Sequence, residues 1–221
     1  IPTLSVDYGF FSKKKEAGSG ASSSKDGRSL PVLVVKDRRS KAIWSIPVPS
    51  KGIEHPYPGQ KLLEVLDMTG YKRVIVKSDQ EPAIEALIKS VKDGWSGELM
   101  PEGAPKGQSK SNGEIERAVQ EVQGIGRTLK DSLEQKSGVK LSETSPLLAW
   151  LVLFAGCLYT IKQKGKDGLT AWNRLRGKPW RQATLQFGEC VQFKHKVPNK
   201  LAARWRTGIY LGIKLDTTER L

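Results

Sequence analysis

The stretch Arg73-Val-Ile-Val-Lys-Ser-Asp79 says most about how the chain folds. Its apolar, β-branched centre favours a short strand, and the strand ends on an acid. Pro82, which suits the first turn of a helix, follows three residues later. Apolar residues then recur at helical spacing, at Ile84, Leu87, Ile88 and Val91. A short strand followed directly by an amphipathic helix is typical of a layered α/β domain.

Upstream of this stretch, the sequence predicts three strands in a meander. Residues 4–11, 30–35 and 42–48 are rich in β-branched and aromatic side chains. Residues 12–28 consist mostly of Gly, Ser and Lys, which predicts a flexible hairpin loop without chemistry. A polar turn at residues 36–40 joins the second strand to the third. Consecutive strands with short connections favour antiparallel pairing.

Downstream, helices and strands alternate. Leu62, Leu63 and Leu66 share one helical face, and Gly70 ends that helix. We expect a strand near residues 97–100, a long helix over residues 111–133 and a last, apolar helix that begins at Ser145-Pro146. The resulting order is β-β-β-α-β-α-β-α-α, which predicts an α/β fold with a mixed five-stranded sheet between layers of helices.

The last quarter of the chain is more basic than the rest. The chain has a formal net charge of +14, and residues 160–221 alone carry 14 basic and four acidic residues. We therefore divide the chain into a core at 1–164 and a basic linker with the start of a small β module at 165–221, whose strands we expect at 189–194 and 209–213. A basic surface suits a phosphate backbone, although composition alone fits a solvated basic protein equally well.

Composition excludes several other classes of protein. Hydrophobic residues make up 38% of the chain, enough to bury a core, which argues against disorder. The longest uncharged stretch, residues 146–161, is shorter than the ~20 residues of a membrane helix, so we expect no membrane partner. Two cysteines and two histidines exclude a zinc finger built from close ligand pairs. Cys157 and Cys190 are expected to be buried thiols, and a reducing, intracellular compartment fits them best.

Three separated acids are the candidate catalytic residues. Asp7 lies in the middle of a predicted strand, where an unpaired charge is costly to bury. Asp79 ends a strand and Glu116 lies in the first turns of the long helix. Taken singly, Asp79 is equally explained as a helix N-cap and Glu116 as an exposed helix carboxylate. Together they can hold two Mg²⁺ ions that stabilise the attacking and leaving oxygens of a phosphoryl transfer.

The order Asp7, Asp79, Glu116 resembles the D, D, E pattern of retroviral and retrotransposon integrases, with 36 residues between the last two acids. Residues 74–79 resemble the family's second-acid strand. Residues 107–117 contain Asn-Gly-Glu-Ile-Glu-Arg, which is similar to the segment around the final glutamate and is the most specific part of the match. Residues 168–179 and 207–212 resemble the region after the core in Ty1/copia elements, so the resemblance covers nearly the whole chain.

The resemblance implies an RNase H-like, three-layer core that uses two Mg²⁺ or Mn²⁺ ions. Its implied activity is that of a polynucleotidyl transferase and endonuclease, which processes retroelement cDNA ends and transfers them into target DNA. Asp7, Asp79 and Glu116 match the family's catalytic, metal-binding acids. The implied partners are element ends, a target duplex and further copies of the chain, in the nucleus or in a cytoplasmic retroelement particle.

The chain departs from the family pattern at two points. Gln80-Glu81-Pro82 follows the second acid, where the family usually has an Asn-Gly run. Glu114 is a rival third acid, but two residues on a helix lie about 200° apart, so Glu114 and Glu116 cannot both face the metals. Glu116 is preferred because it shares a polar helical face with Asn112, Gln120 and Gln123.

Basic and polar residues near these motifs are the candidate DNA contacts. They are Lys110, Asn112, Arg174, Arg176, Lys178 and Arg181, several of them interleaved with tryptophans. Lys110 is equally explained as a solvated side chain. Two rival functions remain open: a catalytically inactive, domesticated DNA-binding domain, and an RNase H-like nuclease such as a ribonuclease H or a resolvase. The presence of all three acids argues against the first, and the Asn-Gly-Glu-Ile-Glu-Arg block favours integrase over the second.

Overall fold

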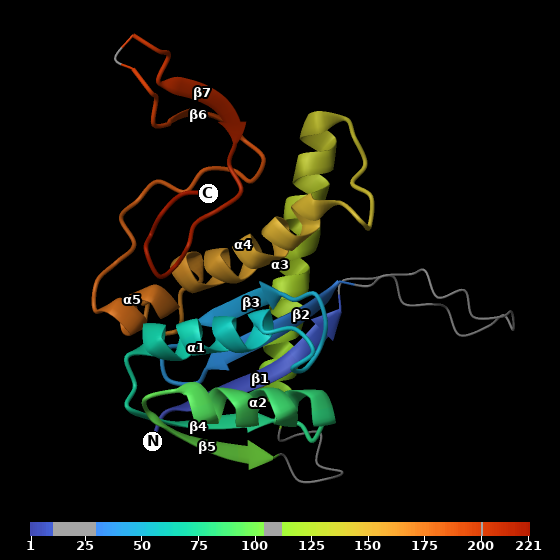
Figure 1. Ribbon diagram of the computed structural model, residues 1–221, viewed down its shortest axis with the longest axis vertical. Helices are drawn as coiled ribbons and strands as arrows, with labels where there is room; N and C mark the ends of the chain where they lie inside the picture. The colour runs from blue at the N-terminus through green and yellow to red at the C-terminus, as the bar shows by residue number, and fades with distance from the viewer. Residues whose placement is uncertain (11–29, 104–111, 200) are drawn as a thin grey trace, which may run out of the picture.

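The computed structural model describes residues 1–10, 30–103, 112–199 and 201–221 (Figure 1). The predicted hairpin loop at 12–28 and Lys110 lie outside the described residues. The helices and strands follow the predicted order, with one further short helix: β1 (Thr3–Phe10), β2 (Pro31–Asp37), β3 (Ile43–Pro47), α1 (Tyr57–Thr69), β4 (Arg73–Ser78), α2 (Pro82–Gly94), β5 (Glu98–Gly103), α3 (Gly113–Ser137), α4 (Pro146–Lys162), α5 (Ala171–Arg176), β6 (Cys190–Lys194) and β7 (Trp205–Ile209).

The sheet is mixed, as the sequence predicts. Its five strands run in the order β3-β2-β1-β4-β5. The meander β1-β2-β3 is antiparallel, whereas β1 pairs with β4, and β4 with β5, in parallel. Because α1 and α2 connect the later strands, β4 returns beside β1 in the same direction. The central strand β1 thus belongs to both the antiparallel and the parallel half of the sheet.

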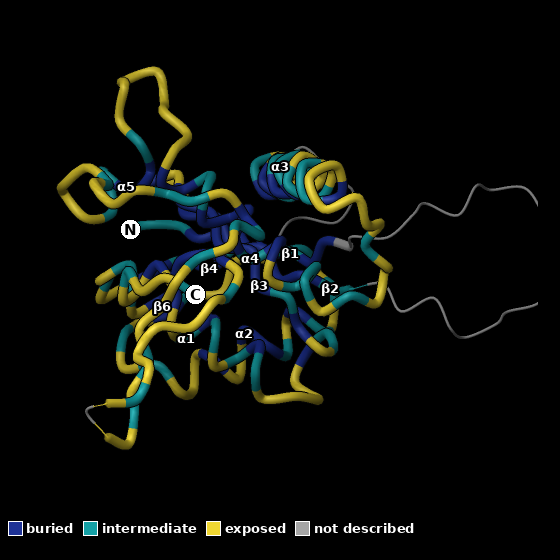
Figure 2. The backbone as a smooth tube through the Cα atoms, turned by 90° about the horizontal axis from the view of Figure 1, so that it is seen from above, coloured by how far each residue is buried: buried dark blue, intermediate teal, exposed yellow. Residues whose placement is uncertain are grey.

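Helices cover the two faces of the sheet in three layers, which Figure 2 shows with α3 above the strands and α1 and α2 below. Leu4 and Val6 of β1 are completely buried in the cluster that α1 and α2 cover. Val34 of β2 lies in the second cluster, with Ile115 and Val122 of α3. The alternation along each strand therefore assigns one set of side chains to each layer.

Helix α4 covers the edge of the sheet along β3. The Thr160 hydroxyl accepts a hydrogen bond from the Ile43 N–H at 3.0 Å and donates to the Ile43 carbonyl at 2.9 Å. The Ser45 hydroxyl donates to the Val152 carbonyl and accepts from the Gly156 N–H. The Thr160 bonds satisfy backbone groups of β3 that an edge strand would otherwise leave open to pairing with another chain, and the Ser45 bonds hold α4 against the strand.

The C-terminal quarter packs on the core. Helix α5 was not predicted, and it buries Trp172, which meets Trp180 edge-on with 4.9 Å between ring centroids. Phe187, Tyr210 and Ile213 are buried in the same cluster as the sheet. The basic segment and the sheet therefore share one hydrophobic core.

Two expectations for this quarter were wrong. The strand expected at 209–213 is instead β7 at Trp205–Ile209, because Tyr210 turns onto Phe154 of α4, with ring centroids 5.6 Å apart. Cys190 is exposed, because its neighbour Val191 packs against the core and successive side chains of a strand point to opposite faces. Cys157 is buried as expected. Within the described ranges, no helix is long and apolar enough to span a membrane.

The close approach of α4 to β3 gives a direct test of this packing. A Cβ atom at Gly156 would lie 2.8 Å from the Ser45 backbone nitrogen, so Gly156→Ala should lower the free energy of unfolding by about 1–3 kcal/mol. Gly124→Ala, on the open side of α3, should instead leave stability unchanged or raise it by up to ~1 kcal/mol. Thermal unfolding of both variants checks this. Equal effects of the two substitutions would contradict the packing.

Candidate functional site

The structure places Asp7 and Asp79 side by side. Val6 of β1 pairs in parallel register with Ser78 of β4, and each acid is the next residue along its strand direction. Side chains at matching positions of neighbouring strands point to the same face. Val6 is buried on the face of α1 and α2, so Asp7 points to the opposite face, where α3 lies.

Asp79 is not the N-cap of α2, the alternative that its position left open. The N-cap is Glu81, whose side chain makes no capping hydrogen bond. The Asp79 carboxylate instead accepts a hydrogen bond from the Glu81 N–H at 3.2 Å, which shapes the turn between strand and helix. One oxygen is thereby fixed, and the carboxylate stands at the carboxyl end of β4.

Asp7 is half-buried, and burial raises the pKa of its carboxyl to about 6. A hydrogen bond from the Tyr8 N–H, 2.7 Å long, opposes this by lowering the pKa. The negative charges of Asp79 and Glu81 contribute to this increase in pKa, and the positive charge of Lys51 opposes it. The largest cause of the raised pKa is therefore burial rather than repulsion between neighbouring acids.

Glu81 and Lys51 belong to this corner of the fold, and sequence reasoning missed both. Lys51, in the loop between β3 and α1, forms a 2.7 Å ion pair with Glu81 and lies 5.1 Å from the centre of the Tyr8 ring. The Tyr8 hydroxyl accepts a hydrogen bond from the Gly52 N–H at 3.0 Å. The departure from the family pattern at residues 80–82 was a signal for Glu81, whereas nothing in the sequence marks Lys51 among 37 basic residues.

Glu116 is exposed on α3, one turn before Val119. Val119 packs against β1 at Gly9, where an added Cβ atom would lie 2.9 Å from the valine methyl group. The helix therefore crosses β1 two residues beyond Asp7. Across the described residues, however, no group of three or more His, Cys, Asp or Glu side chains could hold a metal ion. The structure pairs Asp7 with Asp79, and the three-acid assignment with Glu116 stays a prediction.

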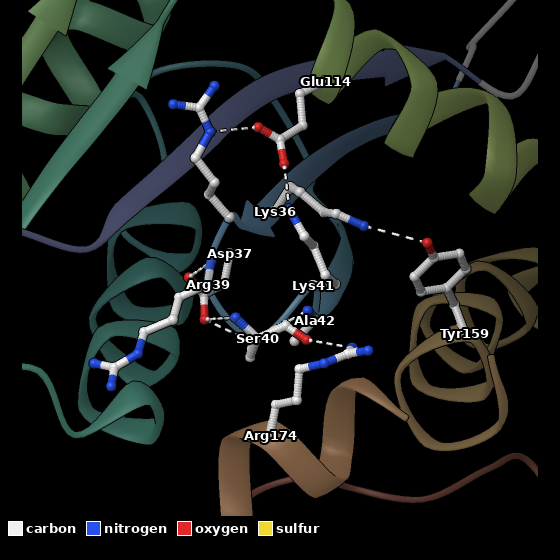
Figure 3. Close-up of polar contacts among 10 residues, drawn as sticks. Lys36, Asp37, Arg39, Ser40, Lys41, Ala42, Glu114, Tyr159 and Arg174 are labelled. Carbon is white, nitrogen blue, oxygen red and sulfur yellow. Dashed lines mark hydrogen bonds and ion pairs between the residues drawn. The ribbon is translucent and has the colours of Figure 1, made fainter. Parts of the chain in front are cut away.

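Glu114, the rival third acid, is engaged elsewhere. Its carboxylate forms ion pairs with Arg38 at 2.9 Å and with Lys41 at 3.5 Å, both from the turn between β2 and β3. Figure 3 shows the pair with Lys41. Within the described residues Glu116 forms no ion pair, and it lies on another side of the helix, about 200° from Glu114. The engagement of Glu114 supports the choice of Glu116.

The residues predicted to contact DNA differ in how many contacts they also make within the protein. The Arg174 guanidinium pairs with Asp167 and donates to the Ser40 carbonyl at 3.2 Å, so it ties α5 to the core. Arg176 lies over the Trp172 ring, 5.5 Å from its centre. Lys178 and Arg181 are exposed, and Asn112 occupies the N-cap position of α3.

Comparison with known proteins identifies the fold but no sequence family. No family model matches the chain, and no curated protein matches it. A chain of the simian T-cell lymphotropic virus intasome, in complex with PP2A regulatory subunit B56 gamma, has a TM-score of 0.54 at 15% identity over 94% of this chain and 67% of its own. The HTLV-2 integrase catalytic core in complex with magnesium gives 0.52 for the trimeric form and 0.51 for the dimeric form, each at 12% identity over 79% of this chain and 95% or 94% of its own.

The chain has the RNase H-like fold of integrase catalytic cores. The predicted fold class is therefore confirmed, including the mixed five-stranded sheet of this integrase-like core. At 12–15% identity, the likeness concerns the fold alone.

The raised pKa of Asp7 predicts that this side chain destabilises the protein when it is ionised. Its folded pKa of about 6 lies above the ordinary value of 3.8, so stability is lost as pH rises through 6. Asp7→Asn should raise the free energy of unfolding at pH 8 by ~1 kcal/mol, after allowance for the exposed part of the carboxyl, and by little at pH 4. Thermal unfolding across this range checks it, with the exposed Asp93→Asn as control. A gain that is the same at both pH values would contradict the assignment.

Proposed function

We propose that this protein is the catalytic core of a retroelement integrase of the Ty1/copia type, which processes cDNA ends and transfers them into target DNA. The observation that carries the proposal is the placement of Asp7 beside Asp79 at the carboxyl ends of neighbouring parallel strands. The fold and the Asn-Gly-Glu-Ile-Glu-Arg segment at the start of α3 support it.

The residues fit a divalent cation. Two carboxylates share one face, and Asp7 is half-buried at a cost that its raised pKa reflects. A bound cation would offset that cost, since an opposite charge favours the ionised carboxylate. We propose that Asp7, Asp79 and Glu116 hold two Mg²⁺ or Mn²⁺ ions, as one relative in complex with magnesium suggests. When bound, such ions supply the positive charge that activates a nucleophile and stabilises a leaving oxygen.

The protein's own residues would then have separate roles. Asp7 and Asp79 stand on the rigid sheet, and the hydrogen bonds from the Tyr8 and Glu81 N–H groups hold one oxygen of each carboxylate. Glu116 comes from the helix that crosses β1 at Gly9. The basic residues of the C-terminal quarter would bind the DNA backbone, so affinity and chemistry would rest on different residues.

The relatives also suggest the assembly. HTLV-2 integrase cores are described in dimeric and trimeric forms, and another relative is part of an intasome. We propose that this chain likewise associates with further copies on element ends, in the nucleus or in a cytoplasmic retroelement particle.

The sharpest test of the chemistry replaces Asp79. Asp79→Asn keeps the size of the side chain and its ability to accept from the Glu81 N–H, but removes a metal-binding charge. It should abolish end processing and strand transfer and leave DNA binding nearly intact. The assay compares both proteins with Mg²⁺ or Mn²⁺ on a duplex that mimics an element end and on an RNA–DNA hybrid, with Asp93→Asn as control.

Each outcome of that assay separates the rival functions. Joined products from the wild type and the control alone would support an integrase. Cleavage of the hybrid without joining would indicate an RNase H-like nuclease. DNA binding without any cleavage would indicate an inactive domesticated domain.

A second test concerns the basic C-terminal quarter. A deletion would expose the shared core, so charge is removed by Lys178→Gln and Arg181→Gln, two exposed positions. DNA binding should weaken equally for all DNA sequences. The slope of the logarithm of the binding constant against the logarithm of salt concentration should decrease by the contribution of about two phosphate contacts. The matched control is Lys89→Gln with Lys92→Gln on α2, which removes the same charge from another face. Equal weakening by both pairs would mean that only net charge matters.

A further inference from the structure

The turn between β2 and β3 is built around a buried carboxylate. Asp37 is completely buried, and it accepts hydrogen bonds from the N–H groups of Arg39 at 3.0 Å and Ser40 at 3.1 Å. The Ser40 hydroxyl donates to it at 2.5 Å and the Tyr71 hydroxyl at 2.9 Å. A buried charge that accepts four hydrogen bonds fixes the backbone around it, because breaking any one bond leaves part of the charge unsatisfied.

Neighbouring elements hold the same turn from two more sides. Arg38 donates its N–H to the Thr3 carbonyl of β1 at 3.0 Å, and Arg174 of α5 donates to the Ser40 carbonyl. Lys41 adopts a positive φ of 69°, which is uncommon for residues other than glycine. The turn is therefore rigid enough to hold side chains in fixed directions.

Two of those side chains reach the start of α3. Arg38 and Lys41 bind the two oxygens of Glu114. Figure 3 shows the Lys41 side chain reaching this carboxylate. A third cation, Lys36, is buried beneath them on β2, and its Nζ atom donates to the Tyr159 hydroxyl of α4 at 3.3 Å. Glu114 is the charge that most favours protonated Lys36, whose pKa burial lowers to about 8. One carboxylate on α3 thus forms ion pairs with two cations of this turn and favours the charged form of a third on β2.

This contact matters because it is a polar anchor at the start of α3, beside the apolar anchor that the buried Ile115 provides. Within the described residues, the N-cap Asn112 makes no side-chain capping hydrogen bond. Glu114 lies two residues before Glu116, and the helix carries any shift of its first turn directly to that side chain. The position of the first turn therefore sets the position of the third acid.

We propose that Glu114 is a positioning residue: Arg38 and Lys41 hold its carboxylate, and this clamp fixes the first turn of α3 and so the place of Glu116 relative to Asp7 and Asp79. The proposal rests on the proposed function, in which Glu116 is the third metal-binding acid. Glu114 itself touches neither the metal nor the DNA. Its effect reaches the reaction through the helix.

The experiment uses Glu114→Gln, the turn variant Arg38→Gln/Lys41→Gln and the combination of all three substitutions. The matched control is Glu121→Gln, which removes an exposed ion pair with Arg117 on the same helix. For each full-length protein, amide hydrogen exchange is measured over residues 113–118 and over residues 126–137. Mn²⁺ binding is measured by calorimetry, and strand joining is measured as a function of Mn²⁺ concentration.

Glu114→Gln should speed exchange at 113–118 but not at 126–137. It should also raise the half-saturating Mn²⁺ concentration by roughly two- to fivefold, the range expected of a partly exposed ion pair, while the KM for DNA stays unchanged. The turn variant should behave alike, and the combined variant should be no worse than either, because all act on one clamp. Additive effects, an unchanged Mn²⁺ dependence, or an equal effect of Glu121→Gln would overturn the proposal.

The two proposals fail in different ways. A wild-type protein that joins no DNA would refute the proposed function, and exchange and Mn²⁺ binding would still decide whether the clamp exists. A wild type that joins DNA, with Glu114→Gln equal to it in exchange and Mn²⁺ dependence, would refute the clamp alone.

Discussion

The parallel pairing of β1 with β4 is the constraint on which the rest of the structure depends. It places Val6 opposite Ser78, and it therefore brings Asp7 beside Asp79 although 71 residues separate them along the chain. A register shifted by one residue would turn one acid to the opposite face of the sheet, among the apolar side chains under α1 and α2. Leu4 and Val6 of β1 and Val74 and Val76 of β4 are all completely buried. A shift by one residue would turn one of these pairs out of the core, and this cost prevents it.

Much of this architecture is readable from local patterns. Gly70 ends α1 in a left-handed conformation and Pro82 begins α2, as the sequence predicts, because each residue's backbone preference is independent of distant contacts. The three meander strands and the mixed sheet follow from the alternation and order of apolar runs. Helix α5 was missed because six residues are too few for a periodic signal, and its burial depends on Trp180 and on the core beneath it.

The site was less predictable than the fold. The placement of Asp7 and Asp79 follows from strand pairing, which sequence order made plausible. The ion pair of Lys51 with Glu81 joins a loop to a helix cap, and the contact of Arg38 and Lys41 with Glu114 joins a turn to a helix. Such contacts arise between segments that are distant in sequence, and a single charged residue carries no local pattern that distinguishes it from a solvated one.

The shared core of the C-terminal quarter has a consequence for how DNA would be held under the proposed function. Phe187, Tyr210 and Ile213 are buried with residues of the sheet, and α5 is tied to the β2–β3 turn through Arg174. If a flexible linker joined the C-terminal quarter to the core, the basic side chains of this quarter could point in many directions. A DNA strand bound to them would then reach Asp7 and Asp79 only by chance. Here the anchored aromatic side chains fix α5 and its flanking cations on the same rigid body as Asp7 and Asp79. If the protein acts as proposed, the path of a bound DNA backbone relative to the acids would be set before any DNA arrives, and little orientational entropy would be left to lose on binding.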